Sequence, residues 1–323
     1  MKAPPFLVNF LSLEEYHRAL PPELLRIYRI EIDDLVTRQL PPVVNKRCLS
    51  TLFGFSPRFI GTLFSNTERY YRTFKIKKGK KIRDIQAPRV ALKVIQKWFG
   101  YHLANSLTFH ESVFGFVKGR STVQGAAVHC GANWIYSVDI RDFFTSTSMN
   151  KVITALMNVG YQQPGASLIA KLCCYNGTLS QGSPASPILS NLTFSKIDEQ
   201  FFEIARRHNI HYTRYADDIV FSGMNSFPSS IKSDIVSIVQ SEGWRLSNEK
   251  EYLAAKPRRL KVYGLLVNGA KPRLTKGYRN KIRAFRHLLT DSKISHEDIS
   301  RVKGHLSYAQ SVEAFNTIIG NNT

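Results

Sequence analysis

The pattern of apolar and polar positions divides the chain into three regions. Residues 1 to about 70 have helix-like apolar spacing that Pro pairs at 21–22 and 41–42 interrupt, which predicts a set of short helices. The next stretch, YYRTFKIKKGKKIRDIQAP, has two basic runs around Gly79 and predicts a hairpin. The segment ALKVIQKWFGYHLANSL follows, and its apolar residues recur with the period of an amphipathic helix.

Strand-like and helix-like segments alternate between about residue 130 and residue 270. Strands are predicted in WIYSVDIRDFF, IHYTRYADDIVFS and KVYGLLVNG, and helices in NKVITALMNVG, SPILSNLTFSKIDEQFFEIARRH and SSIKSDIVSIVQSEG. The residues after about 271 have a helical and basic pattern. This mixture predicts an α+β domain with helices on one side of an antiparallel sheet.

Charge narrows the class of partner. The chain has 45 Lys and Arg against 24 Asp and Glu, a formal charge of +21, which favours nucleic acid first and an anionic membrane second. No apolar run is long enough to span a bilayer, and the apolar start is interrupted by Glu14 and Glu15 without a convincing cleavage site. The four cysteines lack C-x-x-C spacing and suit a reducing compartment. We therefore expect a cytoplasmic protein without a membrane partner.

Two adjacent carboxylates, Asp217 and Asp218, interrupt the hairpin-like stretch IHYTRYADDIVFS. Asp is common in turns because its side chain bonds to nearby backbone, so Ala-Asp-Asp is compatible with a solvated turn. The alternative is a divalent cation, since Mg²⁺ takes hard oxygen ligands and typically uses one or two carboxylates together with substrate phosphates. That alternative requires a further carboxylate elsewhere in the chain.

Asp139 is the best candidate for the further carboxylate. It follows the apolar run Trp134 to Val138, and a charge in a buried strand is costly unless it is paired or bound to metal. Asp142, three residues later, fits the N-cap of a following helix better. Together Asp139, Asp217 and Asp218 would suffice for two Mg²⁺ ions, which stabilise the attacking and leaving oxygens of an in-line displacement at phosphorus.

An ordered set of motifs resembles the reverse transcriptases. YADD resembles their Y-x-D-D signature, VDIRDFF their first palm motif and LSQGSPASPILSN their L-P-Q-G-x-x-x-S-P motif. GFVKGRST, IRDIQAPRVALKVIQKW and KVYGLLVNG resemble segments of retron and group II intron enzymes, and the matches run in family order from about 80 to 275. The resemblance implies a right-hand polymerase with an N-terminal helical region (1–70), interleaved fingers and palm (71–270) and a helical, basic thumb (271–323).

Within the family the chain most resembles retron reverse transcriptases, with two departures. The N-A-x-x-H segment appears as Gly125-Ala-Ala-Val-His129, and V-T-G appears as Val262-Tyr263-Gly264. Another bacterial defence-associated or group II intron-like reverse transcriptase with different priming therefore stays open. A catalytically inactive RNA-binding scaffold and a general basic nucleic-acid-binding protein are the competitors from other classes.

The resemblance also implies roles for individual residues. Asp139, Asp217 and Asp218 match the metal-binding aspartates, and Ile140 would lend a backbone carbonyl to one metal. Arg83, assisted by Lys81, would bind the phosphates of the incoming nucleotide. Phe144 would lie beside the C2′ of this nucleotide, and Gln181 would also lie beside the nucleotide. Lys250 would protonate or neutralise the leaving pyrophosphate. Their structural alternatives are core packing for Phe144, a turn position for Gln181 and a solvated surface for Lys250.

RNA or primer contacts are implied for Tyr215 and for the segment Val262, Tyr263 and Gly264. His129 is expected to recognise RNA or to pack structurally rather than to bind metal. In LTKGYRNKIRAFRHLL, Arg279, Arg283 and Arg286 share one face of a predicted helix, and Ile282, Phe285, Leu288 and Leu289 form the other. The resemblance makes this a thumb helix laid along phosphates, whereas its structural alternative is a solvated charged face.

The implied activity is RNA-templated DNA synthesis from dNTPs with two Mg²⁺ ions. Similarity to retrons further implies that a structured noncoding RNA supplies both the template and a priming guanosine 2′-hydroxyl. The product would be a branched RNA-DNA molecule that participates in phage defence with an effector protein.

Overall fold

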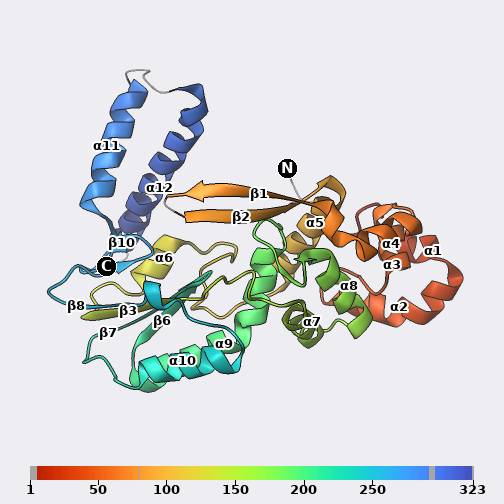
Figure 1. The fold of residues 1–323 in the computed structure, drawn as a ribbon, viewed down its shortest axis with the longest axis horizontal. Helices are drawn as coiled ribbons and strands as arrows, with labels where there is room; N and C mark the ends of the chain where they lie inside the picture. Colours follow the sequence, from red (N-terminus) through yellow and green to blue (C-terminus); the bar gives the residue numbers. More distant parts are fainter. Residues whose placement is uncertain (1–5, 80, 291–294, 322–323) are drawn as a thin grey trace. The chain divides into compact units, whose positions relative to one another are not determined.

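The computed structural model describes residues 6–79, 81–290 and 295–321, and the chain forms two compact units. The first unit comprises Met1–His110, Phe116–Lys118 and Arg141–Lys196; the second comprises Glu111–Gly115, Gly119–Ile140 and Ile197–Thr323. Each unit is therefore assembled from separate stretches of the chain (Figure 1).

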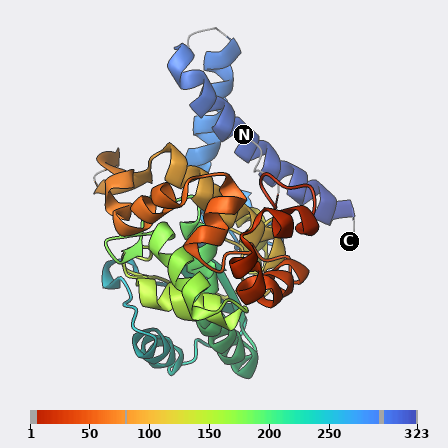
Figure 2. The ribbon, with the colours of Figure 1, turned by 90° about the vertical axis from the view of Figure 1, so that its right-hand side faces the viewer.

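The N-terminal region of the first unit is helical, as its interrupted apolar pattern predicts. The helices are α1 (Leu13–Ala19), α2 (Pro22–Thr37), α3 (Lys46–Phe53), α4 (Pro57–Ser65) and the 3₁₀ helix η1 (Thr67–Tyr70). The side chains of Ser12, Asn45 and Ser56 cap the starts of α1, α3 and α4 by accepting a backbone N–H from the first turn. Figure 2 shows these helices in red and orange; their buried side chains share one core with α5 (Val90–Ser106) and α8 (Gln163–Cys173).

The rest of the first unit contains the predicted basic hairpin and a small second one. Strands β1 (Tyr71–Lys78) and β2 (Lys81–Pro88) pair antiparallel, with Ile76 opposite Arg83. After α7 (Met149–Asn158) and α8, strands β4 (Cys174–Tyr175) and β5 (Thr178–Leu179) form a hairpin. The long helix α9 (Ser186–His208) begins in this unit and continues into the second, with the bounds that its sequence pattern predicts.

A four-stranded antiparallel sheet forms the centre of the second unit, in the order β6-β7-β3-β8. Its strands are β3 (Trp134–Asp139), β6 (His211–Tyr215), β7 (Asp218–Gly223) and β8 (Tyr252–Ala255). Helices α9 and α10 (Ile231–Ser241) lie along one face of this sheet (Figure 1). On this face, Phe201 of α9 contacts the rings of Tyr212 and Phe221. The predicted α+β class with helices against an antiparallel sheet is confirmed.

The opposite face of the sheet is also partly covered, which the sequence pattern did not predict. Val123 and Ala126 of α6 (Thr122–Ala127) pack in one cluster with Ile135 and Val220 of the sheet. The same cluster includes a small sheet, in the order β11-β10-β9, and the last two helices. Their bounds are β9 (Lys261–Val262), β10 (Leu265–Leu266), β11 (Arg273–Leu274), α11 (Lys276–Thr290) and α12 (His296–Asn321); the 3₁₀ helix η2 (Asn248–Lys250) precedes β8.

Two broader expectations can be compared with the structure. All four cysteines are free thiols. Within the described ranges, no helix combines the length and the apolar character that crossing a membrane requires.

Candidate active site

The sheet of the second unit brings three aspartates to one of its ends. Strands β3 and β7 pair in a register that puts Asp139 opposite Asp218. Asp217 lies in the tight turn between β6 and β7, where its carbonyl accepts a hydrogen bond from Ile140 N at 3.1 Å. The flanking Val138 and Ile219 are buried, so the apolar runs that predicted these strands also fix the register that gathers the carboxylates.

The buried Asp139 distinguishes this place from a solvated turn. Asp217 alone, with 41% of its side chain exposed, would suit a turn in water. Asp139 is only 5% exposed, and Lys250 Nζ donates a hydrogen bond to its Oδ1 while lying 4.0 Å from Asp217 Oδ2. Ser247 N donates to Asp139 O at 2.8 Å, which anchors the loop carrying Lys250 beside β3. The structure thus brings Lys250 to the aspartates.

The negative charge at this end of the sheet exceeds what one lysine balances. The pKa of Asp139 is raised to about 7: burial is the largest cause and the charges of Asp217 and Asp218 add to it, whereas Lys250 acts in the opposite direction. A second cation would relieve this repulsion. The donor set, carboxylate oxygens, is the kind that hard divalent cations prefer.

The aspartates do not form a closed cage for a metal ion. Among the side chains that the structure describes, no three from His, Cys, Asp and Glu are arranged to hold an ion by themselves. Mg²⁺ commonly completes its coordination with water and substrate phosphates, so an open set of carboxylates fits it. Ile140, whose backbone carbonyl is a predicted metal ligand, is fully buried and follows Asp139 directly.

Asp142 is not a helix N-cap, contrary to the sequence-based expectation. The next helix, α7, begins at Met149 and is capped by Ser148, whose side chain accepts from Lys151 N. Asp142 instead lies in a turn with a positive φ of 51°. Asp tolerates this left-handed region better than most residues, which explains its presence there.

The proposed nucleotide contacts other than Lys250 lie in the first unit. Arg83 is exposed on β2, and the side chain of Lys81 lies outside the described part of the structure. Phe144 is half-buried, with ring centroids 5.7 Å from Phe143 and 6.2 Å from Phe116. Gln181 is half-buried in a turn before α9.

Gly182, next to Gln181, shows why this turn needs glycine. A Cβ there would lie 2.5 Å from the carbonyl oxygen of Gln86 on β2. The turn and the basic hairpin are therefore in backbone contact, which keeps the proposed contacts Gln181 and Arg83 on adjoining elements.

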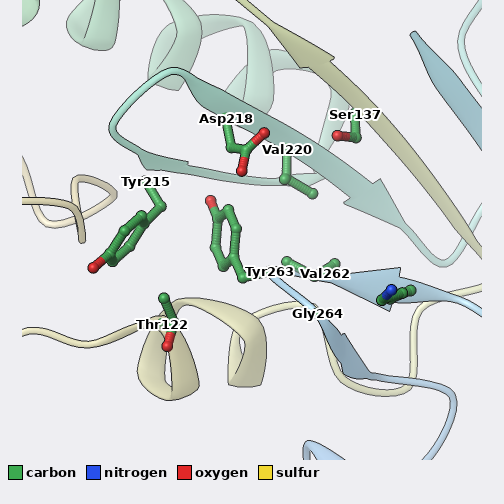
Figure 3. A pocket seen from close by; sticks show the side chains of 9 residues that line it. Thr122, Ser137, Tyr215, Asp218, Val220, Val262, Tyr263 and Gly264 are labelled. Atoms are coloured by element: carbon green, nitrogen blue, oxygen red, sulfur yellow. The ribbon is translucent and has the colours of Figure 1, made fainter. Parts of the chain in front are cut away.

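A cavity of about 350 Å³ adjoins Asp218 (Figure 3). Tyr215 and Tyr263 line it with rings 5.7 Å apart, and Asp218 and Ser137 point into it from the sheet. Val262 also lines the cavity, although its side chain is almost fully buried. Tyr263 and Gly264 have φ values of 48° and 86° and form the left-handed turn between β9 and β10. Thr122, Val220 and Lys261 complete the lining; the sequence had not singled them out.

The two departures from the retron motifs lie in contact with each other. A Cβ added to Gly125 would lie 3.0 Å from Tyr263 Cε2 and 3.1 Å from Phe114 Cγ. A side chain at position 125 would therefore press on the aromatic ring that replaces the Thr of V-T-G. The small residue and the large residue are complementary in volume.

His129 packs in the core, which agrees with the structural one of its two alternatives. It is fully buried, and its Nδ1 and Nε2 each lie 2.7 Å from a hydroxyl oxygen, of Ser222 and Thr213 respectively. Thr213 Oγ1 in turn lies 2.7 Å from the hydroxyl of Tyr263. Burial, with a smaller contribution from His211, lowers the pKa of His129 to about 3.

This depressed pKa predicts a loss of stability in mild acid. The folded state keeps His129 neutral, whereas in the unfolded chain this side chain is protonated below its ordinary pKa near 6.5. The contribution of His129 to the free energy of unfolding is therefore fully present above pH 6.5 and is lost as the pH falls. The expected loss from this group is about 2 kcal/mol at pH 5. His129→Gln should flatten the pH dependence of the unfolding free energy between pH 7 and pH 5, measured with urea, and His287→Gln on α11 is the control. An unchanged slope in His129→Gln would contradict the prediction.

The arginines of the C-terminal region lie as their spacing predicts. Arg279, Arg283 and Arg286 are exposed on α11, and Ile282 is buried. Arg286 lies 3.9 Å from Glu313 of α12. Leu288, expected on the apolar face, is 38% exposed.

Sequence reasoning missed a buried ion pair beneath the hairpin. Asp198 of α9 and Arg214 of β6 pair there, and both are almost inaccessible. The signal was present, since Arg214 lies in the middle of a strand whose neighbours Tyr212 and Thr213 are buried. Its partner could not be read from the sequence because helix α9 and strand β6 meet only in the fold.

Comparison with known proteins agrees with the family that the motifs resemble. The family model described as reverse transcriptase (RNA-dependent DNA polymerase) matches residues 76–272. The chain belongs to this family and is therefore an RNA-directed DNA polymerase, a nucleotidyltransferase; this family generally uses divalent metal ions. Within it, the chain is a retron-type reverse transcriptase, as the following relatives show.

The relatives match over most of this chain. The retron Ec86 reverse transcriptase of Escherichia coli is 33% identical over 280 residues, covering 85% of this chain and 87% of its own length. The retron Mx65 reverse transcriptase of Myxococcus xanthus is 31% identical and covers 74% of this chain and 59% of its own. A solved telomerase from Candida tropicalis aligns over 83% of this chain and 58% of its own with 12% identity and a TM-score of 0.47, too low to bear on the fold.

Proposed function

We propose that this reverse transcriptase copies a structured noncoding RNA into a branched RNA-DNA product and acts in phage defence with an effector protein. The observation that carries the proposal is the match to a retron enzyme over 85% of this chain and 87% of that enzyme. The surplus of 21 positive charges suits a partner made of RNA and its DNA copy. Tyr263 lines the cavity beside Asp218, but neither departure replaces one of the three aspartates, so both are compatible with the same chemistry.

In the proposed reaction Asp139, Asp217 and Asp218 hold two Mg²⁺ ions, with the Ile140 carbonyl as a further ligand. When bound, the ions activate the attacking hydroxyl and stabilise the charge on the phosphates. Lys250 donates to the leaving pyrophosphate, a role that its position between Asp139 and Asp217 supports. Arg83, assisted by Lys81, grips the phosphates of the dNTP, and Gln181 lies beside the nucleotide.

We also propose the division into fingers, palm and thumb. The β1-β2 hairpin with its neighbouring helices acts as the fingers, the sheet bearing the aspartates as the palm, and α11 with α12 as the thumb. The region before residue 71 shares its core with α5 and α8, which supports counting it with the fingers rather than as a separate domain.

The exposed arginines of α11 provide a test of RNA binding. Replacing Arg279, Arg283 and Arg286 together with Gln is expected to weaken binding of the template RNA. It should also reduce the magnitude of the slope of log affinity against log salt by about two to three. Each phosphate contact that is removed no longer releases a counterion when the RNA binds. A filter-binding titration over several salt concentrations measures both quantities.

The matched control removes the same charge elsewhere. Replacing Arg26, Arg29 and Arg47, exposed on α2 and α3, with Gln leaves the net charge equal to that of the α11 variant. If the two variants shift the slope equally, the effect is one of overall charge and α11 is not part of the RNA interface.

The product itself tests the proposed function. The protein expressed with its native locus should copurify with one defined RNA joined to a short DNA, and debranching enzyme should separate the two. Sequencing both strands identifies the template and the priming nucleotide. Recovery of random cellular RNA, or of DNA primed in another way, would overturn the branched-product proposal and leave the polymerase activity in place.

A further inference from the structure

The Asp198–Arg214 pair is buried directly beneath the hairpin that carries two of the aspartates. Asp198 is 1% exposed and Arg214 is 0% exposed. Arg214 Nε and Nη2 donate to the two carboxylate oxygens at 2.7 and 2.6 Å, and the Tyr212 hydroxyl donates to the same carboxylate at 2.6 Å. Removing two charges from water is costly, and such a pair often adds little stability compared with apolar residues of the same volume. Its retention therefore calls for another role.

The guanidinium of Arg214 also reaches the turn itself. Its Nη1 donates to the carbonyl oxygen of Ala216 at 3.0 Å. Ala216 has a φ of 58°, in the left-handed region that residues with a Cβ rarely adopt. The bond is made to the peptide group that joins Ala216 to Asp217. One side chain thus fixes both the helix beneath the sheet and the strained residue before the aspartates.

Backbone from residues 111–115 pairs with Arg214 in β6 and approaches the turn closely. Arg214 N donates to Ser112 O at 2.8 Å, and Phe114 N donates to Arg214 O at 2.8 Å. A Cβ added to Gly115 would lie 2.3 Å from Ala216 N. Ala216 is therefore in close contact with the Gly115 backbone at its N and bonded to the Arg214 guanidinium at its carbonyl oxygen, which leaves the turn little freedom to relax.

We propose that the Asp198–Arg214 pair is a positioning device for Asp217 and Asp218, acting through the Ala216 carbonyl without touching substrate. The inference rests on the proposed catalytic role of those aspartates. Arg is required because its planar fork serves Asp198 with two nitrogens and Ala216 with the third, whereas a Lys ammonium offers a single nitrogen on a flexible stem. Misplacement of a reacting group by about 1 Å costs roughly 10²-fold in rate.

Two variants separate positioning from stability. In Asp198→Leu/Arg214→Met both charges leave together, so no uncompensated charge stays buried and the protein is expected to fold. Arg214→Lys keeps the charge and loses the fork. For both variants we expect kcat for dNTP incorporation to fall, by roughly 10²-fold in the double variant and roughly tenfold in Arg214→Lys, with KM for dNTP and RNA affinity unchanged. Primer extension, thermal unfolding and RNA binding are measured on the full chain.

The control is an ion pair on the surface of the same helix. Arg206 Nη2 lies 2.8 Å from Glu203 Oε2, and both side chains are exposed. Glu203→Gln/Arg206→Gln is expected to leave kcat unchanged.

The outcomes are distinguishable from failure of the site assignment. If the double variant folds and keeps the wild-type kcat, the pair is only structural and the proposal is overturned. If the double variant does not fold, Arg214→Lys decides, and full kcat in that protein overturns the proposal. Asp217→Asn is assayed in parallel: activity in Asp217→Asn refutes the catalytic assignment, whereas its loss together with full kcat in Arg214→Lys refutes the positioning role alone.

Discussion

Asp217→Asn protein is expected to fold, to bind template RNA and to incorporate dNTPs about 10³-fold more slowly than wild type. The substitution removes one negative charge from the group that faces Lys250 while keeping the shape of the side chain. Because 41% of that side chain is exposed, its loss of charge leaves no buried donor stranded and should change the melting temperature little. Single-nucleotide primer extension measures the rate, and filter binding measures the RNA affinity.

Asp142→Asn is the matched control for this experiment. Asp142 is also an exposed aspartate in the first palm motif, but it lies in the turn after the strand. Its variant should extend primers at the wild-type rate. Undiminished extension by well-folded Asp217→Asn protein would remove Asp217 from the catalytic set.

Phe144→Ala protein is expected to accept ribonucleotides, raising the ratio of rNTP to dNTP incorporation by about tenfold or more. The proposed reason is that the ring of Phe144 fills the space that a ribose 2′-hydroxyl would occupy. The ring is only half-buried and lies at the edge of the core of the first unit. It therefore has an open side on which to meet a sugar.

The neighbouring Phe143 provides the comparison for Phe144. Phe143 is buried, with its ring centroid 5.7 Å from that of Phe194, so Phe143→Ala should lower stability by about 3–5 kcal/mol without a change in sugar preference. Competition between each rNTP and its dNTP gives the ratio. A ratio unchanged by Phe144→Ala would make that ring ordinary core.

The strands and long helices could be predicted because local patterns determine them. Helix α9 begins and ends where its apolar period does, and β3 ends at the charged residue that interrupts its apolar run. The β4-β5 hairpin also had a local signal, Asn176-Gly177, whose φ values of 48° and 77° are those the tightest hairpin turns require. The sequence therefore contained a local signal for this hairpin, which was not among the predicted elements.

The parts that could not be predicted depend on residues far apart in the chain. Asp139 was found because a charge in an apolar strand is conspicuous, whereas the hydrogen bond from Lys250 depends on a loop that returns to β3 through Ser247. The burial of His129 depends on hydroxyls of Thr213 and Ser222 from two other strands. The roles given to Arg83, Gln181 and Phe144 came from family resemblance and stay predictions.

The contact between Gly125 and Tyr263 constrains how the retron motifs can change over time. The motif pattern has asparagine and threonine at these two positions, and this chain has glycine and tyrosine. Gly125→Asn alone would force a branched polar group against the Tyr263 ring, which already lies 3.0 Å from a mere Cβ. Tyr263→Thr alone would cause no clash with Gly125; it would leave space there, remove the hydrogen bond with Thr213 and place a β-branched residue at a φ of 48°. The intermediate without a steric clash has glycine at position 125 and threonine at position 263. A change from the motif pattern to this chain therefore begins with glycine at 125, and the reverse change begins with threonine at 263.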